Sequence, residues 1–156
     1  MTGNEKVLEQ LNAALSSELT AIAQYMSQSE MCHNWGYSRL GDLTKARAIE
    51  EMKHAEGIIE RIIFLDGTPA VNVALTPRLG TNVQTQLEID LADELDAVKV
   101  YNQAAEICLE VKDEGSRLLF EGLIKDEERH VDFLEAQLHS AKEMGIELYL
   151  SHQMRS

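Results

Sequence analysis

The chain of 156 residues has little of several residue types that would indicate other classes of protein. Its 2 prolines both lie within residues 67–82, so no proline interrupts long helices elsewhere in the chain. Its 2 cysteines, Cys32 and Cys108, are isolated, which excludes a disulfide framework or a Cys-x-x-Cys zinc site and suits a reducing compartment. No apolar run is long enough for a membrane span, and none follows Met1 as in a signal peptide. We therefore expect a cytoplasmic protein without a membrane partner.

Basic residues are also scarce. Lys and Arg together number 14 against 27 Asp and Glu, which leaves a net charge of −13. Such a balance argues against nucleic acid as a partner and favours cations, although a solvated acidic surface has the same composition. The length is that of one domain with a real core, so we expect a single domain over residues 1–156.

Helical periodicity dominates the chain on both sides of the proline-containing stretch. We predict long helices over residues 4–34, 37–66, 82–111 and 114–143, and a short fifth helix over 146–153. Thr2-x-x-Glu5 and Thr81-x-x-Gln84 have the spacing of capping boxes at two of the starts. The first two and the last two long helices have short connections, whereas residues 67–82 can traverse a bundle. The sequence thus predicts an all-α four-helix bundle of ferritin-like topology, with one long crossover between the second and third helices.

The most informative feature is a set of six ionisable residues that occurs as two copies. In each copy a Glu precedes a Glu-x-x-His motif by 33 positions (18 to 51, and 94 to 127). Each member of the second copy lies 76 positions after its counterpart, and a pair of tyrosines has the same offset. The first copy is Glu18, Glu51 and His54, the second is Glu94, Glu127 and His130, and the tyrosines are Tyr25 and Tyr101.

These residues fall inside the apolar stripes of their helices. The stripe of the first helix, for example, consists of Leu11, Leu15, Glu18, Ile22 and Tyr25. A lone Glu on a helix is usually a solvated surface residue, but an unpaired buried carboxylate costs roughly several kcal/mol. Four in one core require cations, and two divalent ions balance four glutamates. Mixed carboxylate and imidazole ligands favour iron or manganese over magnesium or calcium. The sequence therefore predicts a two-metal centre held by the six residues.

With these residues identified, three motifs resemble those of the bacterioferritins, and the resemblance covers the full length. They are Asn-x-x-Leu-x-x-Glu-Leu-x-Ala-Ile-x-Gln-Tyr at residues 12–25, Glu-Glu-Met-Lys-His-Ala at 50–55 and Asp-Glu-Glu-x-His at 126–130. The resemblance implies a bacterial ferroxidase, in which O2 or H2O2 oxidises Fe(II) to Fe(III) at a di-iron centre. It also implies a 24-subunit shell, built from dimers of this chain, that stores the ferric mineral.

The same resemblance assigns roles to individual residues. Glu51 and Glu127 would bridge the irons, and Glu18 with His54 and Glu94 with His130 would complete the two coordination shells. The position of Tyr25 and Tyr101, seven residues further along the stripes of Glu18 and Glu94, has two interpretations. They are either aromatic side chains of the core or phenols that hydrogen-bond a ligand carboxylate or donate an electron. Met52 would be the axial ligand of a b-type haem shared across a dimer two-fold axis, although spacing alone fits a methionine that fills an interface.

Two further expectations concern the surface. An outer apolar face, made by Ile49, Met52, Ile59 and Ile63 with Leu15, Leu19, Ile22 and Met26, would form the dimer contact. Some relatives carry a histidine and an aspartate for an extra iron site where this chain has Ala46 and Glu50. An inner-surface site through that histidine is therefore doubtful, and we expect Glu50 to face away from the core.

Two other functions compete with iron storage. A ferritin-like di-iron peroxidase or oxidase would use the same ligands without a shell, although a rubrerythrin would normally add a Cys-x-x-Cys pair. A haem-carrying dimer or an inert bundle would leave the repeated carboxylates unexplained. A small redox protein that docks near the haem is plausible from the family alone.

Overall fold

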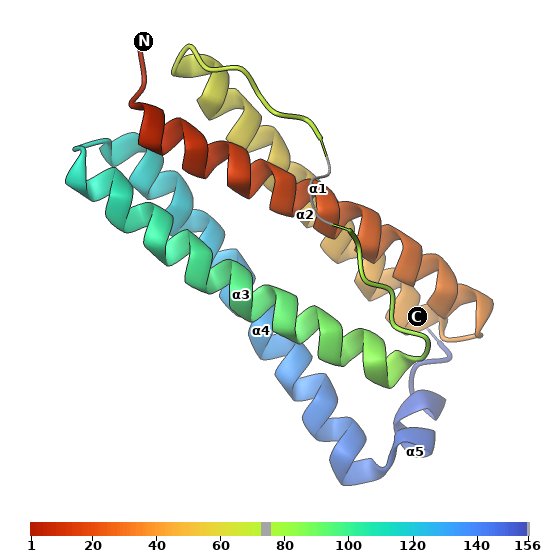
Figure 1. The fold of residues 1–156 in the computed structure, drawn as a ribbon. Coiled ribbons are helices and arrows are strands. Elements are labelled where there is room, and N and C mark those ends of the chain that lie inside the picture. Colours follow the sequence, from red (N-terminus) through yellow and green to blue (C-terminus); the bar gives the residue numbers. More distant parts are fainter. Residues whose placement is uncertain (73–75, 156) are drawn as a thin grey trace.

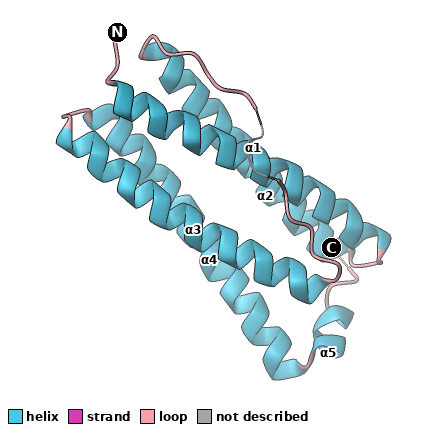
Figure 2. Cartoon of the chain, in the orientation of Figure 1, coloured by secondary structure: helices cyan, strands magenta, loops and turns pink. Residues whose placement is uncertain are grey.

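The computed structural model describes residues 1–72 and 76–155 and consists of helices and loops in that part of the chain (Figures 1 and 2). Four long helices and one short helix follow the predicted order, each within two residues of its expected limits. They are α1 (Glu5–Asn34), α2 (Ser38–Phe64), α3 (Val83–Glu110), α4 (Glu114–Met144) and α5 (Ile146–Ser151).

The long helices form two antiparallel hairpins, α1 with α2 and α3 with α4 (Figure 1). The connection between α2 and α3 runs along the bundle from one end to the other, so these two helices point the same way (Figure 1). The described part of this crossover is tied to α1, since Asn12 donates to the Thr68 carbonyl and accepts from the Ala70 amide. This is the predicted ferritin-like arrangement with one long crossover.

The residues that cap α1 and α3 differ from the two predicted capping boxes. The N-cap of α1 is Asn4, whose side chain accepts a hydrogen bond from the Lys6 amide. The N-cap of α3 is Asn82, which forms a capping box with Thr85. Asparagine is as good an N-cap as serine or threonine, and in both cases it stood closer to the first apolar position. The prediction from Thr2 and Thr81 was therefore wrong in residue but close in position.

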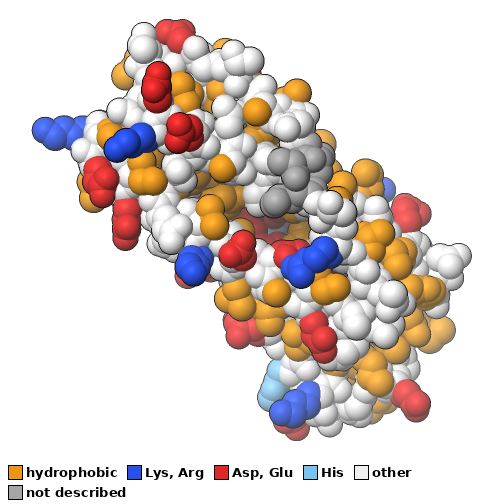
Figure 3. Space-filling model, in the orientation of Figure 1, with side chains coloured by type: hydrophobic (Ala, Val, Ile, Leu, Met, Phe, Trp, Pro, Cys, Tyr) orange, Lys and Arg blue, Asp and Glu red, His pale blue; other side chains and the backbone are white. Residues whose placement is uncertain are grey.

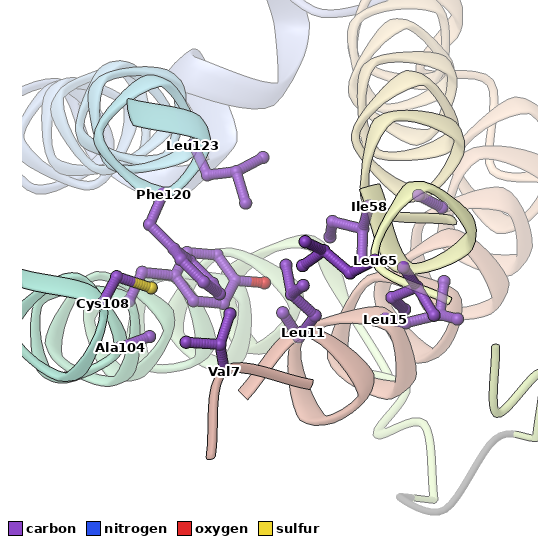
Figure 4. Close-up of a cluster of buried hydrophobic side chains, with 13 residues drawn as sticks. Val7, Leu11, Leu15, Ile58, Leu65, Ala104, Cys108, Phe120 and Leu123 are labelled. Carbon is purple, nitrogen blue, oxygen red and sulfur yellow. The ribbon is translucent and has the colours of Figure 1, made fainter. Parts of the chain in front are cut away.

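Two apolar clusters fill the ends of the bundle. The larger cluster joins side chains from all four long helices, including Leu11, Ile58, Cys108 and Phe120 (Figure 4). The smaller one lies at the other end, where Tyr149 of α5 packs with Cys32, Leu87 and Leu134. The predicted stripes face inward, and the six ionisable residues of the repeat are buried. They therefore occupy the interior of the bundle.

Both cysteines are free and buried, which agrees with the absence of a disulfide framework. Within the described residues, the structure contains no helix with the length and apolar character needed to cross a membrane.

Candidate metal centre

Each of the four long helices places one or two side chains of the six-residue repeat at the centre of the bundle. Glu18 comes from α1 and Glu94 from α3, while α2 and α4 each supply a Glu-x-x-His pair. The spacing of three residues puts the Glu and the His of a pair on one side of a helix. The six side chains are 1% to 8% exposed, so the structure brings together the whole set that the sequence singled out.

The side chains form two groups that share two members. Ligand atoms of Glu18, Glu51, His54 and Glu127 all lie within 4.8 Å of one another, and so do those of Glu51, Glu94, Glu127 and His130. The shared members are Glu51 and Glu127, one from each Glu-x-x-His motif. A pair of adjacent cation sites bridged by two carboxylates fits this arrangement, and each site has one terminal glutamate and one imidazole.

Both imidazoles point the same nitrogen inward. The Nδ1 atom of His54 is 3.2 Å from Glu127 Oε1 and 3.6 Å from Glu18 Oε2. The Nδ1 atom of His130 is 3.2 Å from Glu51 Oε1 and 3.4 Å from Glu94 Oε1. Each Nδ1 is thus placed among carboxylates from other helices, which leaves Nε2 on the outer side of the ring.

Two buried phenols cross between α1 and α3. Tyr25 of α1 donates a hydrogen bond to Glu94 Oε1, and Tyr101 of α3 donates one to Glu18 Oε1 at 2.7 Å. Burial, followed by the nearby carboxylate, raises the pKa of each phenol well above its ordinary value, so both stay protonated and act as donors. Each terminal glutamate is therefore oriented by the tyrosine of the opposite helix.

The centre contains polar atoms that the protein itself leaves unsatisfied. Among the described residues, six buried atoms without a hydrogen-bond partner belong to it: Glu18 Oε2, Glu51 Oε1, His54 Nδ1, Glu94 Oε2, Glu127 Oε1 and His130 Nδ1. Such atoms are costly in a folded protein and call for a bound group. Because one comes from each of the six side chains and all point into the same space, the set fits a pair of metal ions.

The electrostatics of these groups show how the centre compensates its charge without metal. Burial would lower the pKa of both imidazoles, but the surrounding glutamate carboxylates raise the pKa of His54 far above its usual range and that of His130 to about 12. Burial raises the pKa of Glu18, and it raises that of Glu94 to about 7. Protons therefore occupy the positions that cations would take.

A cavity of about 230 Å³ reaches this centre between α1 and α3. Glu18, Glu51, Glu94 and Glu127 line its inner part, and Thr76, Arg78, Asp93 and Asp96 line its outer part. The space-filling view of this side shows a hollow with acidic side chains at its rim (Figure 3). Arg78 of the crossover pairs with Asp93 there. The negative lining suits the passage of cations toward the buried carboxylates.

Sequence reasoning missed the groups that contact the outer side of each imidazole. His54 Nε2 lies 2.8 Å from Asp126 Oδ2, and His130 Nε2 hydrogen-bonds Glu50 Oε2. The expectation that Glu50 faces away was therefore wrong, because its carboxylate turns toward His130 of the neighbouring helix. A signal was present, since an acidic residue directly precedes the Glu of each Glu-x-x-His motif.

Met52 lies outside the bundle core, on the outer face of α2, and is 46% exposed. It lines a groove with Ile22 and Met26 of α1 and with Ala48 and Ile49 of α2. Leu15, expected on this face, is instead fully buried in the core, because its position on α1 belongs to the inward stripe. Leu19, Ile22 and Ile59 are half-buried and pack against the core. The exposed apolar residues of this face are Met26, Ile49, Met52 and Ile63.

Comparisons with known proteins agree with this geometry. The family model for the ferritin-like domain matches residues 8–144. A bacterioferritin of Rhodobacter capsulatus is 46% identical over 145 residues, covering 93% of this chain and 90% of the relative. One from Brucella melitensis is 44% identical over 149 residues (96% and 92% of the two chains), and one from Mycolicibacterium paratuberculosis is 42% identical over 149 residues (96% and 94%). The chain therefore belongs to the ferritin-like family, and within it to the bacterioferritins.

Proposed function

We propose that this chain is a ferroxidase and iron-storage subunit, in which the six residues of the repeat bind two Fe(II) ions as substrate and promote their oxidation. The observation that carries the proposal is the set of six buried ligand atoms without a hydrogen-bond partner, on side chains that form two groups sharing Glu51 and Glu127. Kinship with proteins named bacterioferritin supports the choice of iron as the metal.

The charge of the six candidate ligands favours Fe(III), the oxidised product, over Fe(II). Four carboxylates carry four negative charges, which balance two divalent ions and stabilise trivalent ions still more. Two Fe(II) ions supply two electrons, which with two protons reduce O2 to H2O2 or reduce H2O2 to two water molecules. Tyr25 and Tyr101 hold the terminal glutamates in place during this change of charge, and the cavity between α1 and α3 admits the ions.

The ferroxidase assignment is tested by adding Fe(II) in air and following the formation of Fe(III). We expect Glu18→Ala, Glu94→Ala and His130→Ala to oxidise iron at least about tenfold more slowly, because each removes one ligand. The control is Glu106→Ala, which removes an exposed carboxylate from α3. Rates equal to that of the wild type in all three ligand variants would remove these residues from the site.

The metal positions themselves are tested by soaking a crystal in Fe(II) without oxygen. We expect two anomalous scattering peaks per chain, with Glu51 and Glu127 between them. A single peak, or peaks elsewhere, would contradict the bridging roles.

For the haem, we propose that a b-type haem occupies the groove at Met52 in a dimer of this chain. The groove fits such a group because its walls are apolar and the thioether sulfur of Met52 is accessible as a soft ligand. Two copies of Met52 would hold the iron, and the haem would supply a one-electron carrier near the mineral. Met52→Leu should abolish the absorption spectrum of bis-methionine haem and leave ferroxidation intact.

The remaining features of the proposal concern the whole particle. We propose one domain over residues 1–156, since α5 packs on the end of the bundle that carries the family match. Dimers would assemble into a 24-subunit shell in the bacterial cytoplasm, where a small redox protein could reduce the store. Sizing the purified particle tests the shell. A free dimer would favour the peroxidase or oxidase without storage.

A further inference from the structure

The outer nitrogens of the two candidate imidazole ligands are held by a second repeated pair of acidic residues. Asp126 of α4 bonds His54 of α2, and Glu50 of α2 bonds His130 of α4. Positions 50 and 126 are 76 residues apart, which is the offset that relates the two halves of the centre. Each carboxylate thus fixes the histidine of the other helix, and an N–H bond from Nε2 to it leaves Nδ1 free to bind metal.

One arginine joins these two carboxylates. Nη2 of Arg129 lies 2.8 Å from Glu50 Oε1 and also contacts Asp126 Oδ1. The Arg129 side chain is 63% exposed, so an ion pair of this kind adds little to the stability of the fold. Its geometric effect is larger, because one guanidinium sets the position of both groups that orient the imidazoles.

This arrangement lies on the α2 and α4 side of the centre, whereas the cavity that reaches the ligands opens between α1 and α3. A groove on the α2 and α4 side also approaches His54, with Asp126, Gly57 and Gly122 among its lining residues. Because His54 itself lines this groove, a ring turned outward would enter it, and the bond to Asp126 opposes that turn.

We propose that Arg129, Glu50 and Asp126 form a positioning clip that keeps both imidazoles turned toward the metals and slows metal loss through the α2 and α4 side. The clip rests on the proposed function, since it acts through His54 and His130 as ligands. With the clip in place, the two metal ions enter from the α1 and α3 side and stay bound. The centre then does not serve as a passage through which ions cross the bundle.

Metal retention is measured with Co(II), which reports its ligands by its visible absorption spectrum. The full-length assembled protein is loaded with Co(II), and excess Zn(II), which binds such sites more tightly, then displaces it. We expect Arg129→Gln to lose Co(II) about tenfold faster than the wild type. Removing a group that hydrogen-bonds a metal ligand typically weakens metal binding about 10- to 100-fold, and Arg129 acts on the ligands through such groups. Arg129→Lys, which keeps the charge, should lie in between.

Arg117→Gln is the matched control. Arg117 also belongs to α4 and bridges two carboxylates, Glu114 and Glu121, but neither of these contacts a ligand of the centre. This variant should displace Co(II) at the wild-type rate. Equal rates in Arg129→Gln, Arg117→Gln and the wild type would overturn the clip.

The two carboxylates provide a sharper test, because each supports one half of the centre. In Glu50→Gln, the ion bound by His130 should be released faster than in the wild type. In Asp126→Asn, the ion bound by His54 should be released faster. Displacement of Co(II) from either variant should therefore have two phases, one of them near the wild-type rate. Uniform acceleration of both ions by either variant would overturn the clip, as would no acceleration. Thermal midpoints of the metal-free variants should stay close to that of the wild type, which separates positioning from unfolding.

The same measurement distinguishes failure of the clip from failure of the proposed function. A wild-type chain that binds fewer than two Co(II) ions contradicts the proposed function and the clip with it. Two bound Co(II) ions with equal rates in all variants contradict the clip alone.

Discussion

Loading the centre with two divalent ions should expel protons, and their number can be worked out from the structure. Without metal, the inward nitrogens of both histidines lie among carboxylates and the imidazoles carry protons at neutral pH. A metal ion cannot bind Nδ1 until that proton leaves. Metal binding and deprotonation are therefore one equilibrium at this site.

His54 and His130 each contribute one proton at pH 7, because the carboxylates around them raise both pKa values far above 7. The pKa of Glu94 is raised to about 7, mainly by burial, so it contributes about half a proton. Burial also raises the pKa of Glu18, which favours its protonated form and adds to the number released. The total is therefore at least about two protons per chain. Below pH 7 Glu94 gains its proton and the number rises; above pH 7 Glu94 loses its proton and the number falls. The product of the two binding constants should rise roughly a hundredfold or more per pH unit.

The assay is a titration of the metal-free protein with Zn(II) in weak buffer, with a pH indicator, since Zn(II) binds without oxidation chemistry. His130→Ala should release about one proton fewer than the wild type. Release of fewer than about two protons, with two Zn(II) bound per wild-type chain, would refute the reasoning. It would mean that the imidazoles are neutral in the metal-free protein and that other groups compensate the carboxylates.

Three further outcomes follow from individual contacts. Tyr101→Phe removes a buried 2.7 Å hydrogen bond to a ligand carboxylate and should slow Fe(II) oxidation about tenfold, whereas Tyr149→Phe, which removes a phenol remote from the centre, should leave the rate unchanged. Met52→Leu should yield haem-free protein by absorption spectroscopy, with ferroxidase kinetics like those of the wild type. Arg47→Leu leaves the buried Asp90 without its ion-pair partner and should destabilise the metal-free protein by about 3 kcal/mol in chemical denaturation, while the double variant with Asp90→Ala should recover most of that loss.

The helices and the ligand set were predictable because both depend on periodicity. Apolar residues at helical spacing fix which face of each helix turns inward, and side chains such as Glu18 and His54 share that face whatever the details of packing. The long connection between α2 and α3 then fixes the order of the helices, so that all four ligand-bearing faces meet. For each of these helices, the helix propensity, the residues at the connections and the spacing of apolar residues predict the same structure. Prediction from sequence succeeds where these signals agree.

The contacts around the ligands were not predictable in the same way. Glu50 and Asp126 lie one residue from the ligands, and helical geometry alone places them about 100° from the inward stripe. Their carboxylates contact the imidazoles only because α2 and α4 pack with each histidine level with the acidic residue of the other helix. Arg129 joins them through a long side chain whose partner on α2 is fixed by tertiary packing. A search for identical residues in the two halves also misses a pair that consists of Glu in one and Asp in the other.

The internal repeat covers the centre and buried residues such as Leu11 with Leu87 and Cys32 with Cys108, but not every buried position near the centre. The buried pair of Arg47 and Asp90 corresponds, at the same offset of 76, to Leu123 and Ala14. One half of the bundle interior thus carries a guanidinium that lies 4.4 Å from the ring of Tyr25, while Tyr101 in the other half packs against Phe120. The two phenols bond equivalent glutamates in unlike surroundings. Because a buried cation disfavours removal of an electron from the ring beneath it, the two halves of a site with matching ligands need not be equivalent in their chemistry.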